Sequence, residues 1–334
     1  MLLLPSANRV YAAGVDVLAA AELACVAPAI DPDTLRTEEI AGVRYVCFDA
    51  SDPEATAPIG AHSAAYALFE RLPGTGLQPV RLARPDRFDD DLVSIPKYSG
   101  KTNQQFTRLM VNVTTAAIRD SSGRPLTVLD PMCGRGTTLS TAWTLGQHAA
   151  GVEADAKAVE LYAAFLRTYL RRKRLKHTLD TTPVRRDGRS LGRRLDATVR
   201  PDPDAPRDSD AQLTLSIMPG DTRQSAALWG KRRFDAVVCD TPYGVVHGSA
   251  TGEPGRRDRS PADLLAEAVP VWLSQLRPGG ALGLAWNTLG LSRDQLAAMV
   301  TQAGAEVLDE GPWRQFGHRV DSSIHRDLLV AVRP

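Results

Sequence analysis

Acidic residues stand at the ends of four successive strands that the sequence predicts. They are Asp130, Glu153, Asp221 and Asp240. In an open α/β sheet, ligands bind beyond the carboxyl ends of the strands, so we expect these carboxylates along one edge. Between the first strand and its helix, Gly134 and Gly136 would let the backbone approach a ligand at a helix N-terminus. Each acid alone could be a helix cap, but the ordered set of four favours a binding site.

A dinucleotide-binding turn is the first alternative for this pattern. That turn requires G-x-G-x-x-G, and the third position after Gly136 is Leu139 rather than glycine. Asp130 at the mouth of the turn would also repel a pyrophosphate, whereas it would attract a cationic cofactor. The sequence therefore favours a positively charged ligand over a nucleotide phosphate.

The turn Asp130–Thr137 reads Asp-Pro-x-Cys-Gly-x-Gly-Thr, and an acidic second-strand end follows at Glu153. This combination resembles the class I S-adenosylmethionine-dependent methyltransferases over about Ile95–Pro334. The resemblance implies a Rossmann-like α/β sheet of seven strands with the last strand antiparallel, and S-adenosylmethionine as the cofactor. The residues that it places at the cofactor are Thr102, Asn103, Phe106, Asp130, Pro131, Cys133, Gly134, Gly136, Thr137, Thr138, Glu153, Ala154, Asp221, Thr222 and Asp240.

Charge and hydrogen bonding give these residues their expected roles. Asp130 would balance the positive charge of the cofactor's sulfonium and ammonium groups. Glu153 would accept hydrogen bonds from both ribose hydroxyls, and Asp221 would face the adenine amino group. In the resembling family, the stretch that holds Thr102 and Asn103 closes over the methionine part of the cofactor. The same two residues are expected to cap the helix that follows them.

The segment Asp240–Gly244 reads Asp-Thr-Pro-Tyr-Gly and resembles the Asp-Pro-Pro-Tyr motif of amino-group methyltransferases that act on nucleic acids. Thr241 replaces the first proline of that motif. Hydrogen bonds from an exocyclic amine to Asp240 and to a carbonyl near Pro242 would localise the nitrogen lone pair towards the methyl group, and Tyr243 would stack on the base. Asp240, Pro242 and Tyr243 are therefore the predicted catalytic residues. A Pro-Tyr turn after a buried strand is the purely structural alternative.

The order of the motifs resembles the tRNA guanine-N2 methyltransferases, including the THUMP-associated group. A glycine follows Tyr243, and a further module precedes the cofactor turn. This implies an enzyme that transfers a methyl group to an exocyclic amine of a nucleobase, with guanine N2 in tRNA as the first choice. A DNA adenine-N6 or cytosine-N4 methyltransferase, a small-molecule or protein N-methyltransferase, and a noncatalytic nucleic-acid-binding protein stay open. The intact Asp240, Pro242 and Tyr243 argue against the last of these.

The segment Arg167–Arg200 carries twelve Lys or Arg residues against three Asp, in a chain that is otherwise acidic. Such segments bind the nucleic-acid backbone, and this one is the predicted contact with nucleic acid, tRNA first and DNA second. A solvated surface is the alternative. Lys97 and Lys101 could also face phosphate. Residues 179–212 interrupt the strand–helix rhythm and are expected to be a mobile insertion.

Alternating strands and helices from about residue 95 onward predict a parallel, doubly wound sheet in residues 95–334. The expected strands are 126–129, 149–152, 213–218, 234–239, 280–286 and 324–332, and the expected helices are 104–118, 138–145, 156–176, 261–276 and 292–303. Residues 1–94 predict a small α+β module with strands at 10–11, 43–48, 66–71 and 77–82 and a helix over 15–27. This module resembles the ferredoxin-like or THUMP-like N-terminal regions of the same family.

The composition is that of an ordinary globular protein. The 334 residues are 43% hydrophobic and 24% charged, with a formal net charge of +1, which excludes a chain that is basic throughout. The cysteines Cys25, Cys47, Cys133 and Cys239 are scattered, so we expect no metal cluster, no disulfide framework, and a reducing cytoplasm. No apolar run approaches the ~18 residues of a membrane span, so no membrane partner is expected. The oligomeric state stays open.

Overall fold

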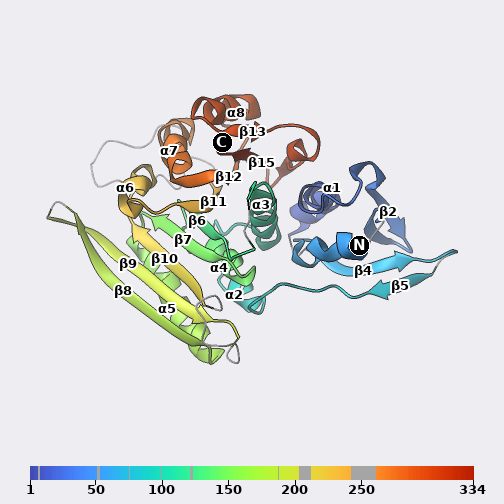
Figure 1. Cartoon of the computed structure of the whole chain (residues 1–334), viewed down its shortest axis with the longest axis horizontal. Helices are drawn as coiled ribbons and strands as arrows, with labels where there is room; N and C mark the ends of the chain where they lie inside the picture. Colours follow the sequence, from blue (N-terminus) through green and yellow to red (C-terminus); the bar gives the residue numbers. More distant parts are fainter. Residues whose placement is uncertain are drawn as a thin grey trace.

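The computed structural model of the chain describes residues 1–6, 8–50, 53–74, 76–98, 100–120, 123–186, 188–202, 212–241 and 261–334. Within them, the chain forms a sheet of ten strands and a second sheet of five. The large sheet and its helices contain the residues predicted to bind the cofactor, and the small sheet belongs to the N-terminal module (Figure 1).

Parallel strands form the centre of the large sheet. Their spatial order is β10 (Leu213–Pro219), β7 (His148–Glu153), β6 (Thr127–Asp130), β11 (Phe234–Asp240) and β12 (Leu276–Asn287). The last strand, β15 (His325–Val332), pairs antiparallel with β12 and with β13 (Glu306–Leu308) on its other side. The expected seven-stranded Rossmann-like sheet with an antiparallel last strand is therefore confirmed. Chain order reverses between β6 and β11, and such a switch point is where open α/β sheets bind ligands.

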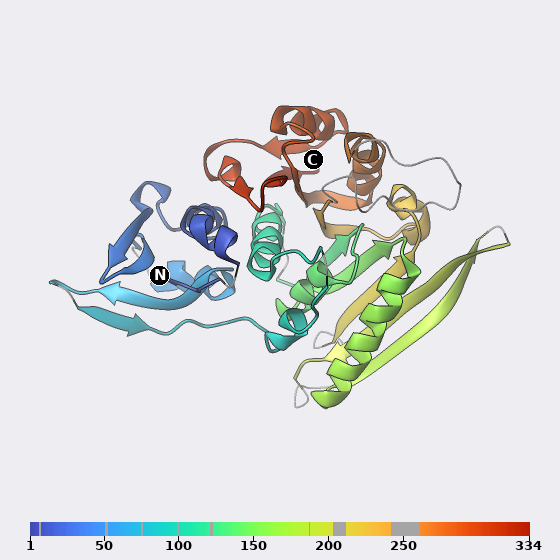
Figure 2. The same ribbon diagram turned by 180° about the vertical axis from the view of Figure 1, so that it is seen from behind.

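Helices cover both faces of this sheet because its strands are apolar on both sides. One core contains buried residues of α3 (Gln104–Ala116), α4 (Thr137–Thr144) and α5 (Ala156–Arg172). The other core contains buried residues of α7 (Pro261–Gln275) and α8 (Arg293–Gln302), with α6 (Ser225–Trp229) beside α7. Neighbouring strand residues alternate between the two cores, as Val128 and Leu129 do on β6. Figures 1 and 2 show the two helical layers from opposite sides.

A long hairpin extends the large sheet beyond β10. Strands β8 (Lys176–Arg186) and β9 (Arg189–Arg200) pair antiparallel, and β9 pairs antiparallel with β10. Most of the segment expected to be a mobile insertion is thus regular sheet, because Leu195, Ala197 and Val199 alternate along β9 and are all buried. Residues 203–211, the Pro- and Asp-rich part, lie outside the described residues.

The N-terminal module has the strand order β2-β3-β1-β4-β5. Its elements are β1 (Leu2–Leu3), α1 (Arg9–Val26), the 3-10 turn η1 (Pro32–Thr34), β2 (Arg36–Ile40), β3 (Val43–Cys47), the 3-10 segment η2 (Pro53–Ala61), β4 (Ala65–Arg71) and β5 (Leu77–Val80). The first four strands have the order of a split βαβ, ferredoxin-like unit, with η2 where the second helix would stand. The strand expected at 10–11 is wrong, because Asn8 caps a helix there through hydrogen bonds from Val10 N and Tyr11 N.

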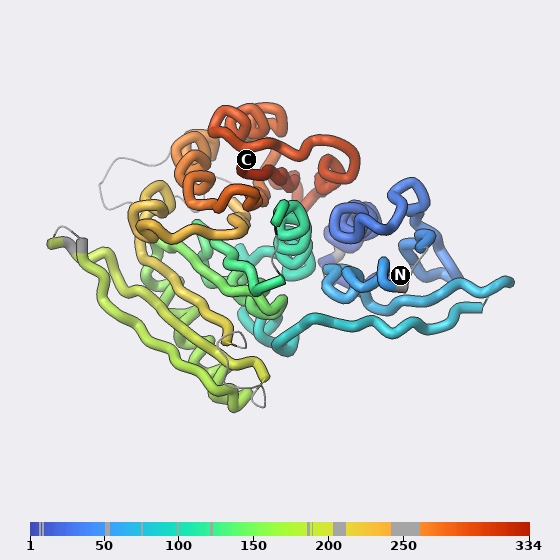
Figure 3. The backbone as a smooth tube through the Cα atoms, viewed as in Figure 1, coloured from blue at the N-terminus to red at the C-terminus, as the bar shows by residue number. Residues whose placement is uncertain are grey.

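The N-terminal module packs directly on the large domain. Helix α1 lies beside α3, and one hydrophobic core runs through both (Figure 3). Buried polar contacts join them as well: Asn112 Nδ2 on α3 donates to Glu22 Oε1 at 2.8 Å and to Ala61 O at 2.7 Å. In the linker between them lies the short helix α2 (Asp91–Ser94). The hairpin β8–β9 projects at the opposite end of the molecule's long axis (Figure 3).

Candidate active site

Three carboxylates lie at the carboxyl ends of neighbouring parallel strands. Glu153 ends β7, Asp130 ends β6 and Asp240 ends β11, in that spatial order. Asp130 is buried, and burial is the main reason why its pKa rises to about 7; the nearby charges of Asp240 and Glu153 raise it further, against hydrogen bonds from Thr138 and Met132. The site therefore contains an acidic group that favours a positive charge beside it.

The turn after β6 is held against β7 by Glu153. Its Oε2 accepts a hydrogen bond from Gly134 N at 2.7 Å, and its Oε1 accepts one from Asp155 N at 2.8 Å. Burial raises the pKa of Glu153, and these hydrogen bonds oppose the rise. Each carboxylate oxygen has a second lone pair, so Glu153 can accept further hydrogen bonds from hydroxyl groups.

The two glycines of the turn have left-handed backbone conformations for different reasons. Gly136 (φ +77°) lies against a ring, and a Cβ there would come within 2.5 Å of Tyr162, so only glycine fits. Gly134 (φ +50°) faces open space, since a Cβ there would meet no atom within 4 Å. The turn thus packs on one side and leaves backbone accessible at Gly134 on the other. Cys133 lies inside it, buried, and its N donates to Val152 O at 3.0 Å.

The segment before α3 lies against the same turn. Tyr98 Oη and Thr137 Oγ1 are 2.6 Å apart, and the Arg135 guanidinium lies 4.6 Å from the centre of the Tyr98 ring. Sequence reasoning did not single out this contact of Tyr98, which stands four residues before Thr102. The contact brings the segment over the start of α4.

Two predictions for this segment meet different outcomes. Asn103 caps α3 as expected, because its Oδ1 accepts from Gln105 N at 2.9 Å and from Phe106 N at 3.2 Å. Lys101 does not face outward to a phosphate. Its Nζ donates to Pro96 O at 2.8 Å and to Val93 O, and burial lowers its pKa to about 8.

Asp240 is held from two other elements. Thr102 Oγ1 donates a hydrogen bond to Asp240 Oδ2, and Arg326 Nη2 on β15 lies 3.7 Å from the same oxygen. The next residue, Thr241, donates from both its N and its Oγ1 to Ala285 O, each at 2.9 Å. The predicted catalytic residues Pro242 and Tyr243 lie outside the described residues.

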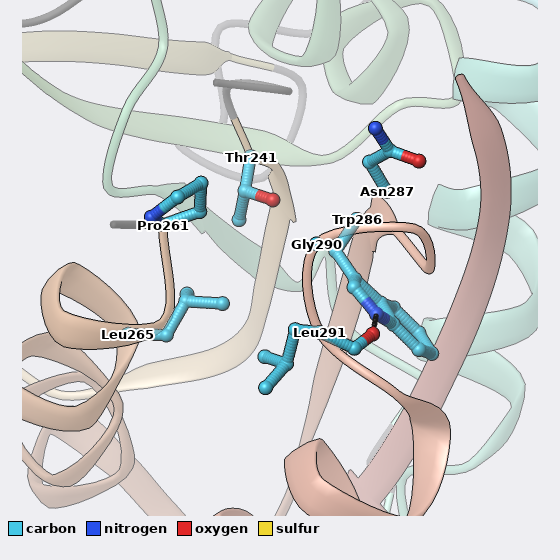
Figure 4. Close-up of a pocket in the computed structure, with 7 residues that line it drawn as sticks. All are labelled: Thr241, Pro261, Leu265, Trp286, Asn287, Gly290 and Leu291. Carbon is cyan, nitrogen blue, oxygen red and sulfur yellow. Dashed lines mark hydrogen bonds between the residues drawn. The ribbon is translucent and has the colours of Figure 1, made fainter. Parts of the chain in front are cut away.

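A small pocket adjoins Thr241 at the end of β11 and β12. It is lined by Thr241, Pro261, Leu265, Trp286, Asn287, Gly290 and Leu291. Within it, Trp286 Nε1 donates to Leu291 O at 2.8 Å (Figure 4). Trp286 is thus both a core residue and a wall beside the predicted catalytic strand.

Two more of the residues predicted to bind the cofactor, Asp221 and Thr222, follow β10. Asp221 follows β10 and begins the 3-10 turn η4 (Thr222–Gln224), where Arg223 Nη2 donates to its Oδ2 at 2.6 Å. Burial alone would raise the pKa of Asp221, but the hydrogen bonds and charge of Arg223 lower it overall. Thr222 Oγ1 accepts from Trp272 Nε1 at 2.9 Å.

Four more of the predicted residues differ in exposure. Pro131 and Thr138 are buried beside Asp130, whereas Ala154 is exposed after β7. Phe106 is fully buried, and the Arg326 guanidinium lies over its ring, 4.8 Å from the centroid.

Other kinds of site find no support in the part of the chain that the structure describes. No three His, Cys, Asp or Glu residues there lie together as a metal site would require. No helix among those residues has the length and apolarity needed to cross a membrane. Cys25, Cys47, Cys133 and Cys239 are free thiols.

Comparison with known proteins yields similarity of structure only. No family model matches the chain, and no curated protein matches its sequence. Solved structures that are similar include TrmN from Thermus thermophilus, at 16% identity and a TM-score of 0.41 over 78% of this chain and 56% of that one. A 16S rRNA methyltransferase (RsmC) from T. thermophilus, in complex with AdoMet and guanosine, is 14% identical with a TM-score of 0.38 over 90% of this chain and 50% of that one.

A third similar structure is magnesium protoporphyrin IX methyltransferase (ChlM) from Synechocystis with bound SAM. It is 14% identical, with a TM-score of 0.42 over 73% of this chain and 90% of that one. The match with the first of these structures spans little more than half of that protein's length.

Proposed function

We propose that this chain is an S-adenosylmethionine-dependent methyltransferase that acts on an exocyclic amine of a nucleobase, with guanine N2 in tRNA as the first choice. The observation that carries the proposal is the convergence of Asp130, Glu153 and Asp240 at the switch point of the sheet, around a turn that exposes backbone at Gly134. Three carboxylates in one half-buried place suit a cation far better than a phosphate.

The residues present fit this cofactor. Asp130, whose pKa burial raises to about 7, would be stabilised in its ionised form by a sulfonium or an ammonium group. Glu153 keeps acceptor capacity on both oxygens for a ribose diol, and Asp221 stands one strand further along, after β10. The cofactor supplies an activated methyl group on a positively charged sulfur.

The chain's own part in the transfer is to place the amine. In our proposal Asp240 accepts an N–H hydrogen bond, which draws the nitrogen lone pair out of conjugation with the ring and towards the methyl carbon. The amine nitrogen would gain the methyl group that the bound cofactor supplies and would lose one proton to water, and S-adenosylhomocysteine would be the other product. Such an in-line displacement depends on approach and preorganised polarity more than on a strong base. Thr102 already holds Asp240 in place. Pro242 and Tyr243 complete the proposed catalytic set.

The proposed nucleic-acid contact falls into two groups. The base group consists of Arg171 and Arg172 at the end of α5, Arg174 in the turn that follows, and Lys176 at the start of β8. The tip group consists of Arg185 and Arg193, towards the other end of the same hairpin. Seven strand positions, from Lys176 to Pro183 opposite Arg193, separate the two groups by roughly 23 Å. We therefore propose two contacts with an extended polyanion in place of the single basic contact that the sequence predicts.

The cofactor proposal and the substrate proposal are tested in one assay. The chain is incubated with S-adenosylmethionine carrying a tritiated methyl group and with bulk unmodified tRNA, genomic DNA or no acceptor. Digested acceptors are then resolved by nucleoside mass spectrometry. Label in N2-methylguanosine of tRNA supports the full proposal. Label in DNA adenine or cytosine supports the alternative substrate, and no transfer to either polymer contradicts a nucleobase substrate.

A further inference from the structure

A continuous line of side chains connects the N-terminal module to Asp240. The Tyr11 ring on α1 meets the His318 ring edge-on, with centroids 5.7 Å apart. His318, on β14 (His318–Arg319), lies 4.8 Å from Phe106 by ring centroids. The Arg326 guanidinium lies over Phe106, 4.8 Å from its centroid, and Arg326 Nη2 lies 3.7 Å from Asp240 Oδ2.

Each member of this line is enclosed, so none can turn away without displacing its neighbours. Phe106 is 0% exposed, Tyr11 and Arg326 are each 4% exposed, and His318 is 9% exposed. Burial lowers the pKa of His318 to about 4, so its ring is neutral at physiological pH. Its Nδ1 lies 2.9 Å from Phe316 O and donates to that carbonyl, which fixes the ring orientation. Packed interiors of this kind transmit strain rather than absorb it.

Residues from two elements that are distant in sequence contact the same oxygen of Asp240. Thr102 reaches Oδ2 from the segment before α3, and Arg326 reaches it from the last strand of the sheet. A carboxylate anchored in this way keeps one orientation before the substrate arrives. Preorganised polar groups accelerate reactions because they need no rearrangement at the moment of transfer.

We propose that Arg326 is a positioning residue for Asp240 and that the N-terminal module, through Tyr11, His318 and Phe106, holds Arg326 in place. The module is then part of the catalytic unit and is more than an appended binding domain. This inference rests on the proposed role of Asp240 in accepting the amine.

The first test measures single-turnover methylation of bulk tRNA by Arg326→Met and Arg326→Lys. We expect Arg326→Met to lower the rate by about 10²-fold, the cost of a misplaced reacting group, and to change the Kd of S-adenosylmethionine little. Arg326→Lys keeps the charge and should restore a large part of the rate. A wild-type rate in folded Arg326→Met would overturn the inference. So would equal losses of rate and of cofactor affinity in both variants.

The second test addresses the module. Tyr11→Leu removes the far ring of the line and should lower the methylation rate by about 3–10-fold, within the range of coupling through packed networks. Tyr11→Phe keeps the ring and should recover most of that loss. Leu23→Ala is the matched control, because Leu23 is fully buried on the same helix and is not one of the side chains that form the line. If Leu23→Ala slows methylation by folded protein as much as Tyr11→Leu does, the module acts through general stability and the inference fails.

A readout without activity separates this inference from the proposed function. Crystal structures of the wild type and of Arg326→Met would show whether Asp240 keeps its contact with Thr102. If Asp240 turns away in the variant, Arg326 positions it, even where the wild type methylates neither RNA nor DNA and the proposed function has failed. If Asp240 holds the same orientation in both structures, the positioning role is overturned whatever the activity.

Discussion

Cofactor affinity should depend on pH through Asp130. Burial raises the pKa of this carboxyl to about 7, from an ordinary value of 3.8, and Asp240 and Glu153 add to the rise. A cationic cofactor binds the ionised form, so binding below pH 7 must first release a proton. For a pKa of about 7, the protonated fraction makes the observed Kd about tenfold larger at pH 6 than at pH 8.

Isothermal titration calorimetry across pH 6–8 measures this change, and Asp130→Asn is the matched variant. The cofactor's own amino group also titrates, so the pH dependence due to Asp130 is taken from the difference between the two proteins. Affinity of the variant should be lower at pH 8 and should lack the tenfold gain between pH 6 and pH 8. An identical pH dependence in wild type and Asp130→Asn would refute the assignment of Asp130 to the positive charge.

Asp130 should also make the stability of the cofactor-free protein depend on pH. Its folded-state pKa lies above the unfolded value, so its contribution favours folding below pH 4 and is lost as pH rises towards 7. The rise from 3.8 to about 7 corresponds to at most roughly 4 kcal/mol. Asp130→Asn should therefore unfold at a higher urea concentration than wild type at pH 8, but not at pH 4. A variant that is less stable than wild type at both values contradicts the raised pKa.

Three further predictions concern other parts of the site. Thr241→Pro removes both hydrogen bonds to Ala285 O and should lower the free energy of unfolding, measured in urea, by about 1–3 kcal/mol. Thr241→Ala removes one of the two bonds and should lower it by about 1 kcal/mol. Equal stability of the two variants would contradict this prediction. Glu153→Ala should weaken cofactor binding by about 1–3 kcal/mol by calorimetry, and unchanged affinity would exclude Glu153 from the ribose. Replacing Arg171, Arg172 and Arg174 together by glutamine should reduce the log–log salt slope of tRNA binding by about 0.7–0.9 for each lost phosphate contact. Lys173→Gln is its control, because Lys173 already pairs with Asp89 at 2.6 Å and Asp91 at 2.7 Å and should leave the slope unchanged.

The sequence predicted the central sheet well because its signals are local. Short apolar runs that end at Asp130, Glu153 and Asp240 became β6, β7 and β11, and the glycine turn lies where the spacing placed it. The antiparallel last strand came from the resemblance, since no local pattern distinguishes a parallel from an antiparallel buried strand.

Other elements could not be predicted because distant packing decides them. Val10 and Tyr11 favour a strand by propensity, but Asn8 caps a helix there and Tyr11 packs against His318, which is far away in sequence. The contacts of Asp240 with Thr102 and Arg326 likewise depend on the assembled fold.

The hairpin did leave a signal in the sequence. Leu195, Ala197 and Val199 alternate with polar residues, as a half-buried strand requires. The expectation of a mobile insertion came instead from the Pro- and Asp-rich stretch over residues 201–210. The composition of that stretch says nothing of the residues before it, whose alternation indicates a strand.

The most direct test of the proposed function is single-turnover methylation by folded Asp240→Ala, with circular dichroism as the check on folding. The glycine turn, Asp130 and Glu153 are intact in this variant, so the Kd of S-adenosylmethionine should change by less than about tenfold, or 1.4 kcal/mol. The methylation rate should fall by about 10²–10³-fold, the usual effect of removing one preorganised polar group. A rate near that of wild type would show that Asp240 does not hold the amine and that the active site lies elsewhere.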